Sequence, residues 1–216
     1  MGLPSGYRRL TYIVGNGNQY IDTGLTVQKS DSWRYILEAD LVSSDNYAGC
    51  NGYLQYQAKI GNGVKSEIDI VYKDITETIT VNGTQVSSQN WSSYSGTNVK
   101  IGILKLGETN NGWYNGAAQS GKIYFCKIYK SDVLVRDFVP CINTSGEVGL
   151  YDLVDKQFYG NAGTGTFTAG PSSLNLPVNI GGTWKDANEA FVNIGGTWKT
   201  VKAVSVNING TWKELS

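Results

Sequence analysis

The stretch Thr78-Ile79-Thr80-Val81-Asn82-Gly83-Thr84-Gln85-Val86 is the clearest local signal in the chain. Two runs rich in β-branched residues flank an Asn-Gly pair, and such residues are enriched in strands. Asn and Gly both accept the positive φ angles that a type I′ turn needs at its two central positions. The sequence therefore predicts a tight antiparallel β-hairpin here.

Similar strand-forming runs lie at short intervals on both sides of this hairpin. Residues 122–129 are apolar at nearly every position, which indicates a central strand. Other runs alternate apolar and polar residues and should leave one face in water. The predicted strands are 19–23, 33–42, 53–60, 66–73, 76–81, 100–106, 122–129, 133–139 and 149–153. Many short strands joined by tight turns favour an all-β fold, an antiparallel sandwich or jelly roll.

The composition argues against several classes of function. The 216 residues include 18 basic and 18 acidic ones, so the chain has no net charge and lacks the basic footprint of a nucleic-acid-binding protein. No apolar run approaches a membrane span, and residues 1–6 do not read as a secretory signal. The absence of histidine removes the most common general base and zinc ligand. We expect Cys50, Cys126 and Cys141 to be small buried side chains.

The C-terminal part contains one motif three times. It reads Val-Asn-Ile-Gly-Gly-Thr-Trp-Lys at 178–185 and 192–199, and Val-Asn-Ile-Asn-Gly-Thr-Trp-Lys at 206–213, which gives a repeat of 14 residues. Each Gly-Gly or Asn-Gly pair fits a type I′ turn, with Ile180 opposite Thr183 and Asn179 opposite Trp184 in the first copy. A lone two-stranded hairpin is marginally stable, so the copies are expected to stack, dock or oligomerise.

The sequence predicts two parts joined by a linker. Gly, Ser and Pro concentrate between residues 160 and 177, and these residues interrupt strands. We therefore expect the jelly roll at 1–170, a linker at 171–177 and a small C-terminal domain of three β-hairpin repeats at 178–216.

Two longer stretches resemble a known family. The first comprises Leu3-Pro4-Ser5-Gly6-Tyr7 with residues 10–13 and 19–24, and the second includes Asp137-Phe138-Val139-Pro140-Cys141, residues 146–152 and residues 158–161. Together they resemble the laminin-G-like, concanavalin A-like jelly rolls of surface proteins from gut bacteria and their phages. The C-terminal hairpins resemble repeats that follow such domains in phage tail and virion proteins.

This resemblance implies a binding protein. Residues 1–170 would bind a host cell-surface glycan, and the chain would belong to a phage virion as a tail, fibre or head-decoration protein assembled in the host cytoplasm. Its other partners would be further virion proteins and copies of itself, with no nucleic acid and no membrane insertion. A carbohydrate-binding adhesin module on a bacterial cell surface is the alternative. The resemblance leaves a calcium ion possible, without assigned ligands; no other cofactor or metal is expected.

A glycoside hydrolase is the least favoured reading. Some jelly rolls of this shape are glucanases with a Glu-x-Asp-x-x-Glu strand, and this chain contains Glu67-Ile68-Asp69. Glu67 and Asp69 would share one strand face. The position of the second glutamate is occupied by Tyr72, so one of the two carboxyl groups that retaining hydrolysis requires is missing. We expect no enzymatic activity and no catalytic residue.

The best candidate for ligand binding is the aromatic, Asn-rich loop at 107–116. Trp113 and Tyr114 would stack on a pyranose ring, and Asn110, Asn111 and Asn115 would reach its hydroxyl groups. The alternative is that Trp113 folds back to cap the sandwich.

Other aromatic residues are assigned to a second loop and to the repeats. The loop at 45–53 offers Tyr47 and Tyr53 as further ligand contacts. The three repeat tryptophans either line a binding surface or are buried in an assembly contact. Burial is favoured, because each can bury a large apolar area; they are Trp184, Trp198 and Trp212.

Overall fold

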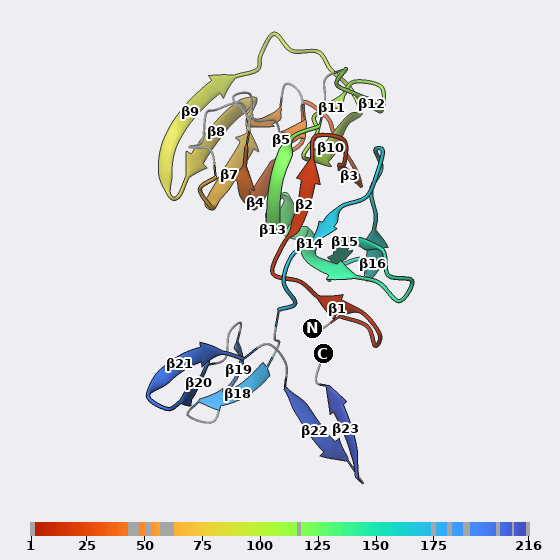
Figure 1. Ribbon diagram of the computed structural model, residues 1–216. Coiled ribbons are helices and arrows are strands. Elements are labelled where there is room, and N and C mark those ends of the chain that lie inside the picture. Colours follow the sequence, from red (N-terminus) through yellow and green to blue (C-terminus); the bar gives the residue numbers. More distant parts are fainter. Residues whose placement is uncertain are drawn as a thin grey trace.

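The computed structural model shows an all-β chain. It describes residues 3–42, 48–50, 53–56, 63–115, 118–173, 176–180, 183–187, 191–201, 204–208 and 210–214. Within these ranges every regular element is a strand, and no helix that could cross a membrane is found. Two sheets face each other in a sandwich-like arrangement, and three small hairpins follow them (Figure 1).

The first sheet has 11 strands, all paired antiparallel. Its order is β16 (Gln157–Tyr159), β15 (Val148–Asp152), β14 (Val133–Ile142), β13 (Ser120–Lys130), β4 (Trp33–Leu41), β7 (Ser66–Lys73), β8 (Thr76–Val81) and β9 (Thr84–Asn90). Beside this path, β1 (Arg8–Arg9) pairs with β14, β2 (Ile13–Asn16) with β13, and β17 (Thr168–Ala169) with β2. The central place predicted for residues 122–129 is confirmed, since β13 lies between β14 and β4.

The second sheet has six strands. Its order is β12 (Gly112–Trp113), β11 (Gly107–Glu108), β5 (Ala48–Cys50), β10 (Val99–Ile103) and β3 (Ile21–Val27), with β6 (Leu54–Tyr56) paired to β5. All these pairings are antiparallel except the short contact between β11 and β5. The chain therefore crosses repeatedly between the two sheets.

One hydrophobic core joins the two sheets. In β4, Tyr35, Leu37 and Ala39 are fully buried, and the residues between them are at least partly exposed, so this strand shows the predicted alternation. From the second sheet, Ile101 and Ile103 enter the same cluster. The three cysteines are buried and unpaired, as expected from their spacing. Burial raises the pKa of each thiol, which keeps it protonated and unreactive.

The hairpin predicted at 78–86 is confirmed. β8 and β9 pair antiparallel around Asn82 and Gly83, whose φ angles are 49° and 77°. Both values lie in the left-handed region that a type I′ turn requires. The Asn82 side chain also accepts a hydrogen bond from the Glu67 backbone N–H at 2.9 Å, which fixes the turn against β7.

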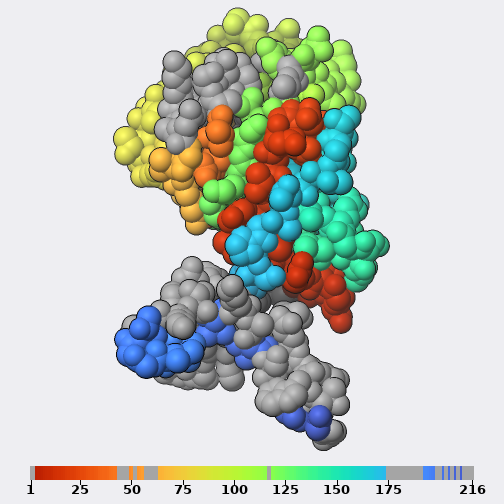
Figure 2. Space-filling model, viewed as in Figure 1, coloured from red at the N-terminus to blue at the C-terminus, as the bar shows by residue number. Residues whose placement is uncertain are grey.

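The segment after β16 returns along the front of the sandwich. It pairs with β2 through β17, and Figure 2 shows it lying beside β2. The Thr11 N–H donates to Pro171 O at 2.8 Å, and the Ser173 N–H donates to Arg9 O at 2.9 Å. The structure therefore shortens the linker predicted at 171–177. Residues 171–173 are bonded to the sandwich, and residues 176–177 already belong to the first hairpin.

The C-terminal repeats form three separate two-stranded sheets (Figure 1). Their strands are β18 (Leu176–Ile180) with β19 (Thr183–Ala187), β20 (Phe191–Ile194) with β21 (Thr197–Thr200), and β22 (Ser205–Ile208) with β23 (Thr211–Glu214). The predicted register holds in the first copy, with Asn179 opposite Trp184. Within the described ranges, no ladder joins one hairpin to another or to the sandwich.

The repeated asparagine has a local role in each turn that the structure describes. Asn193 Oδ1 accepts the Gly196 N–H at 2.9 Å, and Asn207 Oδ1 accepts the Gly210 N–H at 2.8 Å. Asparagine favours turns because its short side chain can bond the backbone two or three residues away. The motif thus encodes the turn with its asparagine as well as with its glycines.

Candidate functional site

The loop between β11 and β12 is held in one conformation by its backbone. Asn110 and Asn111 have φ angles of 54° and 60°, which asparagine adopts more readily than most residues. Their N–H groups donate to the carbonyls of Thr97 and Asn98 at 2.9 and 3.0 Å. Both asparagine residues are exposed. The loop therefore presents their amides from a fixed backbone, which lowers the entropy cost of binding a ligand.

Trp113 lies on the outer face of the second sheet. Gly102 of β10 provides the space for it, because a Cβ at that position would be 2.7 Å from Trp113 Cζ3. The indole packs against Tyr20, with the ring centroids 4.7 Å apart and the planes tilted by 57°. Both rings are partly exposed. Trp113 therefore folds back onto the sandwich, as the alternative expectation had it, yet part of its ring remains accessible.

Charged side chains border this aromatic pair. Lys100 Nζ lies 5.0 Å from the centroid of the Trp113 ring and forms an ion pair of 2.6 Å with Asp22 Oδ2. Lys105 Nζ lies 5.0 Å from the centroid of the Tyr20 ring. Burial, with a smaller contribution from Asp22, raises the pKa of Tyr20, so its hydroxyl stays neutral. The two ring surfaces are thus framed by groups that can donate or accept hydrogen bonds.

Tyr114 and Asn115 follow Trp113 directly in the chain. Tyr114 is 40% exposed, and its N–H donates to Leu106 O at 3.0 Å. Asn115 is exposed beside it. One segment therefore carries all five ligand residues predicted for this loop. We call the packed pair of Tyr20 and Trp113, together with the exposed Tyr114 that follows Trp113 in the chain, the aromatic platform.

Tyr20 was not selected from the sequence. The pairing of β3 with β10, and the packing of Trp113 over β10, bring it beside Trp113 across 93 positions of chain. The one signal in the sequence was its place in the predicted strand 19–23. Tyr20 precedes the apolar Ile21, which is buried, so the alternation of a strand turns Tyr20 outward.

The second predicted loop does not provide a site in the described part of the chain. Tyr47 lies outside the described residues. Tyr53 is 0% exposed: its ring packs between Tyr72 and Tyr94, with centroid distances of 5.1 and 4.9 Å, and its hydroxyl donates to Gly96 O at 2.6 Å. The prediction that Tyr53 contacts a ligand is therefore wrong, because its hydroxyl is satisfied inside the core.

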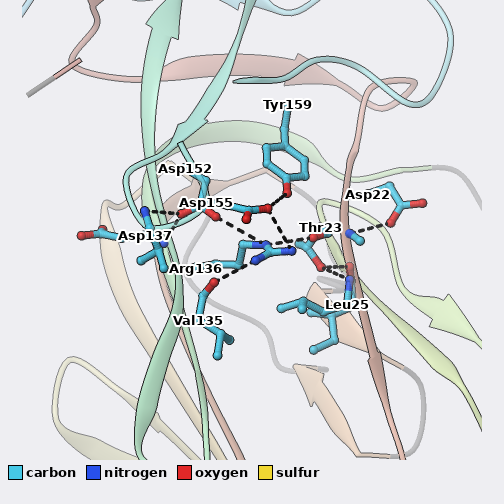
Figure 3. A network of polar contacts seen from close by, with 12 residues as sticks. Asp22, Thr23, Leu25, Val135, Arg136, Asp137, Asp152, Asp155 and Tyr159 are labelled. Atoms are coloured by element: carbon cyan, nitrogen blue, oxygen red, sulfur yellow. Dashed lines mark hydrogen bonds and ion pairs between the residues drawn. The ribbon is translucent and has the colours of Figure 1, made fainter. Parts of the chain in front are cut away.

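A network of ion pairs and hydrogen bonds around Arg136 anchors β3 (Figure 3). Arg136 Nε donates to Thr23 O at 3.2 Å, and the guanidinium forms ion pairs of 3.5 Å with Asp152 and Asp155. The side chain of Asp152 is fully buried. Arg136 thus connects β14 and β15 to β3. The contact on β3 is at Thr23, next in the chain to Asp22, whose ion pair with Lys100 borders the aromatic platform.

The strand that resembles a glucanase motif has a different use here. Glu67 and Asp69 share the outer face of β7, while Ile68 and Ile70 are buried. Arg34 holds Asp69 in a two-pronged contact, with N–O distances of 2.9 and 2.7 Å. Tyr72, in the position of the missing glutamate, is buried. A cavity of about 390 Å³ borders the Arg34–Asp69 pair.

Metal-ligating side chains do not gather in groups of three or more anywhere in the described ranges. The side chains of Trp184, Trp198 and Trp212 lie outside the described part, although their backbones are placed in β19, β21 and β23.

Comparison with protein families, curated proteins and solved structures finds no match for this chain.

Proposed function

We propose that this chain is a non-catalytic surface protein of a phage virion that binds a host cell-surface glycan through its sandwich. The observation that carries the proposal is the aromatic platform beside a rigid, asparagine-bearing loop. Sugar rings present apolar C–H faces and a rim of hydroxyl groups. Tyr and Trp offer large contact areas at low entropy cost, and Asn offers both a donor and an acceptor.

The arrangement of strands supports a jelly roll of the laminin-G-like, concanavalin A-like kind. A jelly roll packs two antiparallel sheets whose strands alternate along the chain. Here β2, β4, β7–β9 and β13–β16 belong to the first sheet, and β3, β5, β6 and β10–β12 to the second. Such a frame carries variable loops on a fixed core, which suits recognition.

The surroundings of the acidic strand favour binding over hydrolysis. A retaining glycosidase needs two carboxyl groups about 5–5.5 Å apart, one as nucleophile and one as acid and base. Asp69 is neutralised by Arg34, and the next outward position on β7, Val71, carries no carboxyl group. We therefore propose no role in glycan cleavage.

The C-terminal hairpins support a role in assembly. Two-stranded sheets are marginal in water alone, and each repeat leaves both of its strand edges unpaired within the described ranges. Val192 and Ile194 are 42% and 57% exposed. Copies of this chain or other virion proteins would cover such residues. The alternative is an adhesin module on a bacterial cell, and proteomics of purified particles separates the two.

Binding to an array of bacterial surface glycans tests the proposal. A glycan that binds the full chain is then titrated by calorimetry against Trp113→Ala. Central aromatic residues of a binding site commonly contribute about 2 kcal/mol or more, so affinity should fall by about tenfold or more. Trp91→Ala removes another partly buried tryptophan from a different loop and should change affinity less than about twofold. Equal affinity of wild type and Trp113→Ala would reject the platform as the site.

A further inference from the structure

A second cluster of aromatic and charged groups lies on the outer face of the first sheet. The rings of Tyr12 and Tyr124 meet edge to face, with centroids 5.4 Å apart. Lys122 Nζ lies 5.4 Å from the Tyr12 ring centroid, and Lys65 Nζ lies 4.4 Å from the Tyr124 ring centroid. The Trp113 platform belongs to the other sheet, so the two clusters are on opposite outer faces of the sandwich.

Asp40 of β4 stands within this cluster, opposite Lys122 in the ladder with β13. Its side chain is 7% exposed, and Oδ2 accepts a hydrogen bond from Lys122 Nζ at 3.2 Å. The other oxygen, Oδ1, is buried and has no hydrogen-bond partner among the described residues. A buried acceptor without a donor is rare in proteins and is destabilising, more so when it carries charge. Oδ1 is therefore complementary to a donor that the described part of the chain does not supply.

The neighbouring groups define what that donor belongs to. A free anion would be repelled by the carboxylates of Asp40 and Glu38. A free cation would be repelled by Lys65 and Lys122, whose ammonium groups already lie over the tyrosine rings. A neutral ligand avoids both conflicts. Hydroxyl groups could donate to Asp40 and accept from the lysines, while an apolar ring face packs on tyrosine. The two lysine side chains are 51% and 40% exposed, so they can move aside for it.

We infer that the cluster of Asp40, Tyr12, Tyr124, Lys65 and Lys122 is a second binding site for a neutral hydroxylated ring, a hexopyranose unit of a glycan. Asp40 Oδ1 accepts a sugar hydroxyl there. The inference deepens the proposed function and rests on it for the class of ligand, but it uses none of the residues of the aromatic platform. A chain with sites on opposite faces can bridge two glycan chains and gain avidity.

Nuclear magnetic resonance of the labelled full chain tests this site directly. The probes are free glucose, galactose, mannose and N-acetylglucosamine, each titrated while amide and indole signals are followed. At least one sugar should produce saturable shifts around Tyr12, Asp40 and Tyr124. Asp40→Asn keeps the shape of the side chain but removes its charge, and should weaken this response about tenfold or more. Asp69→Asn, a carboxylate on the same sheet face, should leave it unchanged.

The possible outcomes separate the two sites. Trp113→Ala should abolish the response of the platform and preserve that of the Asp40 cluster. Shifts at Trp113 without any at the Asp40 cluster would overturn this inference and leave the proposed function standing. Shifts at the cluster that survive Asp40→Asn at full strength would also overturn it. Shifts at the cluster alone would support this site and reject the platform. If none of the four sugars shifts the signals of the Asp40 cluster, the cluster is not a sugar-binding site and the inference fails.

Discussion

Glu77 should make the stability of the sandwich fall as the pH rises. This side chain is 1% exposed on the core side of β8. Its carboxyl group accepts hydrogen bonds from the Gln55 N–H at 2.5 Å and from Trp91 Nε1–H at 3.2 Å. Burial outweighs these two donors and raises the pKa of Glu77 to about 7 from an ordinary value of 4.5. The folded protein therefore holds a proton that the unfolded chain releases at lower pH.

The size of the effect follows from this difference in pKa. Each pKa unit corresponds to about 1.36 kcal/mol, so the rise to about 7 makes the folded state about 3 kcal/mol less stable above that pH. Because the folded pKa is the higher one, this stability is fully present below pH 4.5 and is lost as the pH rises through about 7.

Urea unfolding followed by tryptophan fluorescence measures this effect at about pH 5 and about pH 8.5. Glu77→Gln replaces the carboxyl group with an amide that does not titrate. It should therefore remove this part of the pH dependence, while leaving the contributions of the other acids in place. The difference between wild type and variant isolates Glu77. The same slope of unfolding free energy against pH in both proteins would refute the reasoning.

Two other substitutions test the packing around the platform. Gly102→Ala places a Cβ 2.2 Å from Lys105 O and 2.7 Å from Trp113 Cζ3, so it should cost about 1–3 kcal/mol by denaturant unfolding. It should also weaken the proposed glycan binding, as expected for Trp113→Ala; unchanged stability and binding would contradict the close approach. Arg136→Met leaves the buried Asp152 carboxylate unpaired and should cost about 3–5 kcal/mol. In a double-mutant cycle, Asp152→Asn should recover part of that loss, and strictly additive effects would show that the pair does not interact.

The local features of this fold were predictable from the sequence, because they depend on neighbouring residues. The turn at Asn82-Gly83, the repeat hairpins and the limits of β7 and β8 follow from turn chemistry and strand patterns. Tyr53 was misassigned because a tyrosine in a Gly-rich loop looks the same whether it faces solvent or the core. Its burial depends on Tyr72 of β7 and on Tyr94 of the loop between β9 and β10.

The candidate site was predictable only in part. The segment with Trp113, Tyr114 and the three asparagines was found because its residues are contiguous in sequence. Tyr20 joins it through the pairing of β3 with β10, and Gly102 makes room for the indole. Neither contact leaves a trace in the sequence around residue 113. The Asp40 cluster was missed for the same reason, since it is drawn from two strands, β4 and β13, and two connecting segments.

The location of a bound sugar tests the central claim most directly. A crystal structure of the full chain with a glycan selected from the array should show a pyranose ring packed on Trp113 or Tyr114. At least one of its hydroxyl groups should lie within hydrogen-bond distance of Asn110, Asn111 or Asn115. A glycan bound elsewhere, with the surfaces of Trp113 and Tyr114 uncovered, would contradict the assignment of recognition to the aromatic platform.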